Sequence, residues 1–279
     1  MNSFIQLSDD ERRSVFIETG IQMGIPPFYV EKDFWVCWVL LNLFNSDKLS
    51  DKLVFRGGTS LSKAWNCIER FSEDIDLSLI PDKSFFSDNP IDSEISGMER
   101  ERRFQRLRKA SRSILHEQLI PLLNQTISNS GIEVKLNEQI DLDRDPFVIE
   151  LIYPSLGFDI PGSYHHNAVK LEISSRAVSL PMEEKIIRPF ISDVLLKSFI
   201  NSIIRIPTVH PIRTFWGKAW ILYEHHNRKG QHLPALNQSR HIYDLHQLWR
   251  NLELKKLNQF TATNLVSYSR EFRLIKPYN

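Results

Sequence analysis

Cysteine is scarce in this chain. Cys37 and Cys67 are the two cysteines among 279 residues, which is too few for a disulfide framework and indicates a reducing compartment. Each lies in an apolar, helix-like context, and we interpret both as small buried hydrophobic residues.

Long apolar runs and a secretory signal are also missing. The N-terminus, MNSFIQLSDDERRSVF, is polar and acidic, whereas a signal peptide needs a basic start and an apolar centre. The most apolar stretch, FWVCWVLLNLF (34–44), is about half as long as a transmembrane helix and is typical of a buried core helix. We expect a cytoplasmic protein that does not bind membranes.

The chain has no excess charge of either sign, because 35 lysines and arginines balance 34 aspartates and glutamates. The total therefore gives no indication of nucleic acid, and a basic surface has to come from local clustering. In RERRFQRLRKASR (100–112), seven basic residues accompany one acid, Glu101. Such a helix could follow an RNA backbone or be an ordinary solvated face, and the loop HHNRKGQH (225–232) has the same two interpretations.

The nine histidines do not predict zinc. His165-His166 and His225-His226 are adjacent pairs with no partnering cysteines, so we do not expect a structural zinc site. The sequence also lacks internal repeats and low-complexity segments.

The order of periodic segments predicts an α+β fold. Helical patterns cover about 7–24, with Ser8 as N-cap and Gly20 or Gly24 as the end, and also 28–44 and 98–128. Strand-like patterns occupy 52–56, 74–80, 132–136, 147–153 and 168–175. After LPMEE (180–184) the pattern is mostly helical. We therefore expect a mixed sheet flanked by helices in residues 1–185 and a helical domain in residues 186–279.

The most informative stretch is FRGGTSLSKAWNCIERFSEDIDLSLI (55–80). Because strand side chains alternate, Asp74 and Asp76 project from one face, about 7 Å apart. Two carboxylates so close repel each other unless a cation lies between them. Mg²⁺ is the natural candidate, since it takes one or two carboxylates together with water and phosphate oxygens.

Ahead of these acids, Gly57 and Gly58 precede a short helix for which Thr59 or Ser60 is the predicted cap. A glycine turn at a helix N-terminus exposes N–H groups that suit phosphate. Turn and acids together fit a metal-bound nucleoside triphosphate. The glycine pair and the acid pair are each weak evidence for such a site when taken alone, because Gly-Gly is usually just a turn and D-x-D also occurs on solvated strands. Lys63 is not placed as in a Walker loop.

A third carboxylate is available in AVKLEISS (168–175). Lys170, Glu172 and Ser174 face one way in this strand, and Val169, Leu171 and Ile173 the other. If the strand lies beside DIDLSLI (74–80), Glu172 joins the acid pair and Arg176 approaches a phosphate. Otherwise Glu172 is a surface acid.

RGGTSLSK…RFSEDIDLSL resembles the nucleotidyltransferase fold of the DNA polymerase β type, whose pattern is hG[GS] followed by [DE]h[DE]. The gap from Gly58 to Asp74 is a few residues longer than is usual there, but it resembles the AbiEii/AbiGii toxin family of abortive-infection and toxin–antitoxin systems. Further similar pieces are VEKDFWVCWVL, VKLEISSR, HPIRTFWGKAWILYEHHNR and SRHIYDLHQL. The resemblance runs from about residue 25 to residue 250.

The resemblance implies a role for each matching position. The triphosphate would be bound by Gly57, Gly58, Thr59, Ser60, Lys218 and Arg240, to which the strand pairing considered above adds Arg176. The metal, Mg²⁺ or alternatively Mn²⁺, would be held by Asp74, Asp76 and Glu172. Lys218 and Asp244 would complete the catalytic set, with Asp244 contributed by the helical C-terminal domain. The implied substrate is an NTP, with GTP among the candidates, the acceptor is RNA and in particular tRNA, and the partner is a cognate antitoxin.

Without the resemblance, the C-terminal pieces have ordinary interpretations. In SRHIYDLHQLWRNL (239–252), Ile242, Leu245, Leu248 and Trp249 make an apolar face that leaves Arg240, His241 and Asp244 on the other side. A lone lysine among aromatic residues, as Lys218 is, usually lies at the surface. Two other functions also remain open: a toxin that binds a nucleotide without transferring it, and transfer to a protein or small-molecule hydroxyl.

Overall fold

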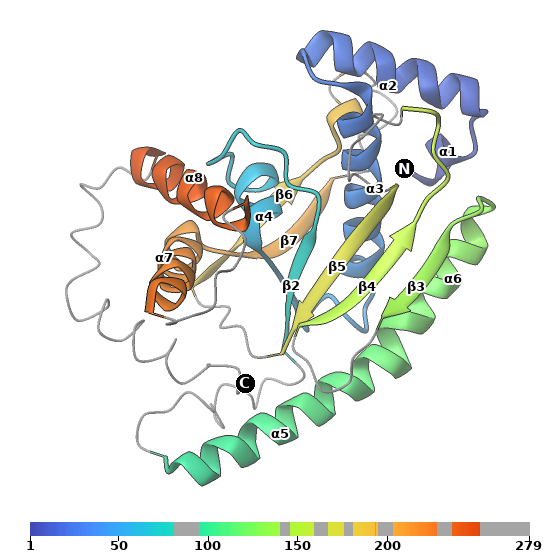
Figure 1. The fold of residues 1–279 in the computed structure, drawn as a ribbon. Coiled ribbons are helices and arrows are strands. Elements are labelled where there is room, and N and C mark those ends of the chain that lie inside the picture. The colour runs from blue at the N-terminus through green and yellow to red at the C-terminus, as the bar shows by residue number, and fades with distance from the viewer. Residues whose placement is uncertain are drawn as a thin grey trace.

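The computed structural model describes residues 1–80, 95–139, 146–158, 167–175, 181–192, 194, 203–227 and 236–251. These residues form a seven-stranded mixed sheet in the order β3-β4-β5-β2-β1-β7-β6, with helices around it (Figure 1). The predicted class, a mixed sheet flanked by helices, is confirmed.

The strands are β1 (Leu53–Arg56), β2 (Ile75–Leu79), β3 (Lys135–Gln139), β4 (Phe147–Ile152), β5 (Ala168–Ser174), β6 (Met182–Ile187) and β7 (Ile204–Val209). The helices are α1 (Asn2–Ile5), α2 (Asp9–Met23), α3 (Pro27–Phe44), α4 (Gly57–Lys63), α5 (Gly97–Ile114), α6 (Ile120–Ser130), α7 (Pro211–Asn227) and α8 (Leu236–Asn251). A π-helical turn, Leu115–Leu119, joins α5 to α6, and Phe190–Ser192 forms a 3₁₀ turn.

The main core lies between α3 and the sheet. Alternation along β2 buries Ile75, Leu77 and Leu79, as predicted, and the same alternation recurs in β4 and β5. From Phe34 to Phe44 helix α3 is almost entirely apolar, and most of the residues of the whole helix are buried. Within the described residues no helix is both long and apolar enough to cross a membrane.

The helix α2 begins and ends where the sequence predicts. The Ser8 side chain accepts a hydrogen bond from the backbone N–H of Glu11, whose carboxylate in turn accepts from the Ser8 N–H. At the other end Gly24 adopts φ +67°, a left-handed conformation that favours glycine.

Charged residues in α3 connect it to four other segments. Glu31, Lys32 and Asp33 are adjacent and all buried, which is rare for charged side chains unless they are paired. Their partners are the Leu156 N–H (3.3 Å), the Glu73 carboxylate (2.5 Å) and, for Asp33, the Lys63 ammonium (2.6 Å) and the Phe190 N–H (2.7 Å). The E-K-D piece of the family resemblance is therefore a structural anchor in this chain.

The expectation of a mostly helical region after LPMEE (180–184) is wrong for two segments. Residue 185 lies inside β6, and β6 pairs antiparallel with β7, which in turn lies parallel to β1. The sheet therefore continues to Val209. Strand β6 is an edge strand with the composition MEEKII, and its exposed charges hide the alternation that marks a half-buried strand.

The prediction that Thr59 or Ser60 caps the helix after the glycine pair is also wrong. Helix α4 starts directly from β1 at Gly57, with Arg56 in the N-cap position, so both hydroxyl residues lie inside the helix. It ends at Lys63, because Asn66 takes φ +51° and turns the chain out of the helix.

Candidate active site

The predicted acids lie side by side on two neighbouring strands. Strand β2 pairs in parallel with β5, in a register that sets Asp76 beside Glu172. Side chains at paired positions project from the same face of a sheet, and Asp74 is two residues before Asp76 along the chain. The condition that the sequence left open, that β5 lies beside DIDLSLI (74–80), is met.

Electrostatics at Asp76 reflect this crowding. Burial raises the pKa of Asp76 to about 6, and the neighbouring carboxylates of Glu172 and Asp74 act in the same direction. The cations Arg56 and Lys218 oppose the rise. A carboxylate held among other carboxylates at such a cost is a site that a divalent cation would stabilise.

Lys170 offsets the negative charge of the other two acids, Asp74 and Glu172. Burial raises the pKa of Asp74 above its usual value, and Lys170 and Arg240 act against that rise while Glu172 adds to it. The Lys170 ammonium lies 2.5 Å from the Glu172 carboxylate on the same face of β5. Burial would lower the pKa of Lys170, but this hydrogen bond and the surrounding acids raise it overall. Lys170 therefore occupies one side of the acid cluster.

The glycine turn touches the acid pair directly. Arg56 is the register partner of Asp76, and the next residue, Gly57, has φ +77°. A Cβ atom placed on Gly57 would lie 1.8 Å from Oδ2 of Asp76. Glycine is therefore required here for two reasons, the left-handed backbone and the closeness of the carboxylate.

Replacing Gly57 by alanine should disable the site more than its backbone strain alone explains. Gly24→Ala is the matched control, because Gly24 has a similar φ of +67° and no heavy atom within 4 Å of an added Cβ. We expect Gly24→Ala to cost about 1–2 kcal/mol of unfolding free energy and to leave nucleotide binding unchanged. Gly57→Ala should cost more and weaken nucleotide binding at least ~10-fold, because Asp76 must move. Equal effects of the two substitutions in urea unfolding and nucleotide titration would contradict this.

The hydroxyls predicted to bind phosphate are engaged with the protein. Thr59 donates its hydroxyl to the backbone carbonyl of Asp74, and Ser60 donates to the carbonyl of Gly57 at 2.9 Å. Both side chains are buried. They thus tie α4 to the start of β2, and the parts of this turn left for a phosphate are backbone N–H groups. Arg176 lies outside the described residues.

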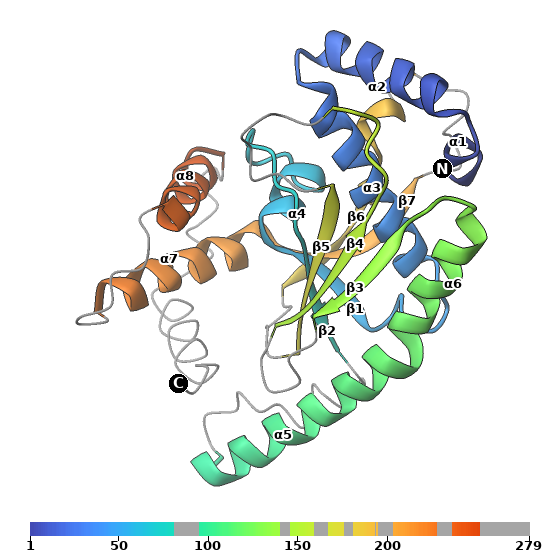
Figure 2. The same cartoon turned by 45° about the vertical axis from the view of Figure 1, so that its right-hand side comes forward.

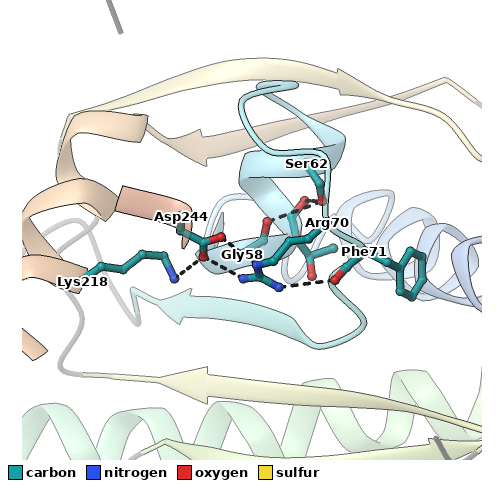
Figure 3. A network of polar contacts seen from close by, with 7 residues as sticks. Gly58, Ser62, Arg70, Phe71, Lys218 and Asp244 are labelled. Carbon is teal, nitrogen blue, oxygen red and sulfur yellow. Dashed lines mark hydrogen bonds and ion pairs between the residues drawn. The ribbon is translucent and has the colours of Figure 1, made fainter. Parts of the chain in front are cut away.

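Asp244 is the centre of a second cluster (Figure 3). Its carboxylate is fully buried and accepts two hydrogen bonds from Arg70, Nε to Oδ1 and Nη2 to Oδ2, each 2.7 Å long. The Lys218 ammonium lies 2.9 Å from Oδ2. Burial alone would raise the pKa of Asp244, but these cations hold it below its usual value. A bidentate arginine contact of this kind fixes the orientation of the Asp244 carboxylate and also compensates its charge.

The face of α8 that packs inward differs from the predicted one. Ile242 and Trp249 are 56% and 55% exposed, whereas Asp244 and Leu248 are 0% exposed. The predicted apolar face is therefore wrong in part, since the helix turns its aspartate inward. Arg70 and Lys218 supply the opposite charge that makes this burial tolerable. Arg240 is exposed, and its influence reaches Asp74.

Helices α7 and α8 dock together on the segment that follows α4, and both lie on the left of Figure 1 and Figure 2. A small apolar cluster of Leu61, Ile68 and Leu248 forms the contact. The Asn251 side chain donates to the Cys67 carbonyl at 2.7 Å. Arg70 extends this contact towards the glycine turn, because a Cβ on Gly58 would lie 2.8 Å from its Nη2.

Lys218 consequently belongs to both clusters. It pairs with Asp244 and also acts on Asp76. It is buried, in contrast to the ordinary surface position of a lone lysine. Asp244 holds its ammonium in place and Arg70 holds Asp244, so we regard these two as positioning residues.

Sequence reasoning missed three charged residues of this region: Arg56, Arg70 and Lys170. Each had a signal. Arg56 and Arg70 flank the two quoted motifs, RGGTS and RFSEDID, and Lys170 is two residues before Glu172 on the same strand face. What the sequence did not show was their partners, which lie up to 174 positions away.

The carboxylate oxygens of the acid cluster are donor atoms that suit a divalent cation. In the described part of the chain, no three histidine, cysteine, aspartate or glutamate side chains are grouped so as to surround one metal ion. Asp74 and Asp76 nevertheless offer the one or two carboxylates that Mg²⁺ takes before water and phosphate oxygens complete its shell. The donor set therefore fits Mg²⁺ through these two residues, with Glu172 held by Lys170.

A glycine turn against an acid pair, with a lysine contributed by a distant helix, is an arrangement that can hold a metal-bound nucleoside triphosphate. The family model "Nucleotidyl transferase AbiEii toxin, Type IV TA system" matches residues 38–276. The chain belongs to this family, as the sequence predicted.

Other comparisons add little to this assignment. A similar solved structure is that of MenT4, the nucleotidyltransferase toxin Rv2826c from Mycobacterium tuberculosis H37Rv, with 18% identity and a TM-score of 0.39. The match covers 74% of this chain and 57% of MenT4, so the chain spans less than two thirds of that protein. No curated protein matches the chain.

Proposed function

We propose that this protein transfers a nucleoside monophosphate from an NTP to an RNA acceptor, the 3′ end of a tRNA, in a reaction that depends on Mg²⁺. The observation that carries the proposal is the register of β2 and β5, which sets Asp76 beside Glu172 with Gly57 against Asp76. Family membership supports an NTP as substrate and a cognate antitoxin as partner.

Asp74 and Asp76 are the proposed ligands of Mg²⁺, with Mn²⁺ as an alternative. The ion, when bound, would neutralise charge on the phosphates and orient them. The backbone N–H groups at Gly57 and Gly58 would contact the triphosphate, with Thr59 and Ser60 fixing this turn through their hydroxyls. Lys218, held by Asp244, would offset charge on the departing pyrophosphate. Arg240 is proposed as a further phosphate contact because the family resemblance implies it, and Arg176 because it follows the strand that carries Glu172.

In the proposed step, the 3′-hydroxyl oxygen of the acceptor forms a bond to the α-phosphorus. The bond between that phosphorus and the oxygen leading to the β-phosphate breaks, and pyrophosphate leaves with the electron pair. Glu172 would take the hydroxyl proton, for which Lys170 must release its carboxylate. Positioning and charge neutralisation supply most of the catalysis in such reactions.

A toxin that binds a nucleotide without transferring it is the second candidate, and one observation favours it. Glu172 is paired with Lys170, and Asp244 with Arg70 and Lys218, so two proposed catalytic acids are neutralised by cations. Transfer to a protein or small-molecule hydroxyl is the third candidate, because the site itself does not define the acceptor.

Incubation of the protein with each radiolabelled NTP, Mg²⁺ and total tRNA would separate the candidates. We expect label on tRNA, lost when EDTA removes the metal and restored by Mg²⁺ or Mn²⁺. Label on protein or on a small molecule would favour the third candidate. Nucleotide binding in an equilibrium titration without label on any acceptor would favour the second.

A further inference from the structure

Helix α5 has a fixed basic face. Seven lysines and arginines lie between Arg100 and Arg112 in a chain whose formal net charge is +1. The opposite face buries Phe104, Leu107, Ser111 and Ile114. Because that face is packed, the helix cannot rotate, and three of the seven basic residues, Arg102, Arg106 and Lys109, stay exposed while the other four are half-buried.

Two of these cations, Arg102 and Lys109, are exposed and form no ion pair with any described residue. Arg106 lies between them, 63% exposed and within 3.1 Å of Glu99. At a rise of about 1.5 Å per residue, Arg102, Arg106 and Lys109 succeed one another every ~5–6 Å along one side of the helix. A concavity of about 450 Å³ runs along this side, lined by Glu99, Arg102, Gln105, Arg106 and Lys109 among the described residues.

We propose that this face of α5 binds the phosphate backbone of the RNA acceptor. The inference rests on the proposed function, and it assigns the acceptor to a surface outside the catalytic cluster. The first turns of α5 lie below α7, the helix that contains Lys218, in Figure 1 and in Figure 2.

RNA fits this face better than an acidic protein does. Guanidinium groups bind phosphates in a bidentate geometry. A row of cations binds the phosphate backbone of a nucleic acid irrespective of its base sequence. Between Arg102 and Ser113 the exposed side chains are polar or charged except for Ala110. From Arg102 onward the face therefore lacks the aromatic and aliphatic anchors at the centre of most protein interfaces, and its exposed large apolar side chain is Met98, one turn earlier.

The test is the binding of total tRNA to Arg102→Glu/Lys109→Glu, followed by fluorescence anisotropy at several KCl concentrations. The matched control is Lys48→Glu/Lys135→Glu, which makes the same charge change at two exposed lysines on other elements. At about 100 mM salt we expect the α5 variant to bind ~10- to 100-fold more weakly and the slope of log K against log salt to fall by ~2. NTP binding should be unchanged in both variants.

The outcomes separate this inference from the proposed function. Wild-type protein that binds tRNA through α5 but transfers no label would overturn the proposed function alone. Wild-type protein that does not bind tRNA, or an α5 variant that binds it as the control does, would overturn the inference. Unchanged tRNA binding with lost neutralisation by the antitoxin would instead assign the face to that partner. Arg102→Gln/Lys109→Gln, which removes the same two phosphate contacts and should also lower the slope by ~2, serves if the reversal variant misfolds.

Discussion

Asp76→Ala is expected to lower nucleotidyl transfer by ~10³-fold or more and to abolish toxicity. The Asp76 carboxylate lies beside Glu172 and against Gly57, so it joins the acid cluster to the glycine turn. Its removal deletes a proposed metal ligand, which supplies several kcal/mol of charge stabilisation. The measurements are initial transfer rates to tRNA and growth after induction of the toxin.

The control is Asp51→Ala, which removes a 60% exposed aspartate at the turn before β1 and should leave transfer unchanged. Stability should not fall with Asp76→Ala, because the substitution removes a carboxyl whose pKa is raised by burial and, to a smaller extent, by the neighbouring acids Glu172 and Asp74. A folded Asp76→Ala variant that is still toxic would refute the mechanism.

Asp244→Ala should destabilise the protein by about 3–5 kcal/mol and also reduce transfer. The substitution leaves the side chains of Arg70 and Lys218, 19% and 11% exposed, without their shared buried counter-charge. Lys218 then loses the contact that fixes its ammonium. The measurement is the free energy of unfolding in urea, together with the transfer rate under conditions in which the variant is folded.

The control is Glu184→Ala, which removes an exposed pair with Arg205 and should cost at most ~0.5 kcal/mol. A double-mutant cycle of Arg70→Ala and Asp244→Ala should give a coupling energy of at least ~1 kcal/mol, since the two groups share both hydrogen bonds. If Asp244→Ala proves no more costly than Glu184→Ala, the anchoring role of this cluster is wrong.

The local sequence pattern was sufficient to predict features that depend on only a few neighbouring residues. Alternation in DIDLSLI (74–80) and in AVKLEISS (168–175) put each set of acids on one strand face, and Ser8 and Gly24 marked the ends of α2. Family resemblance added Lys218 and Asp244, which no local pattern selects. Its prediction of the AbiEii/AbiGii toxin family is confirmed by the family match.

Local pattern failed where the deciding contact is distant. The orientation of α8 is one case, since hydrophobicity favoured Ile242 and Trp249 as buried residues while the fold buries Asp244. The cost of that burial is offset by Arg70, from a segment 174 positions earlier. Strand β6 is the other case, because its charges satisfy an edge position that exists only once β7 has paired with β1.

The sequence by itself determined the chemistry available to this protein: carboxylates in pairs, a glycine turn that admits close approach, and a basic amphipathic helix. These depend on backbone conformation and side-chain periodicity, which act over a few residues. The tertiary structure alone decided which charges face one another, namely Asp76 with Glu172, Glu172 with Lys170, and Asp244 with Arg70 and Lys218. Electrostatic energy depends on separation in space and on burial, and neither follows from separation along the chain.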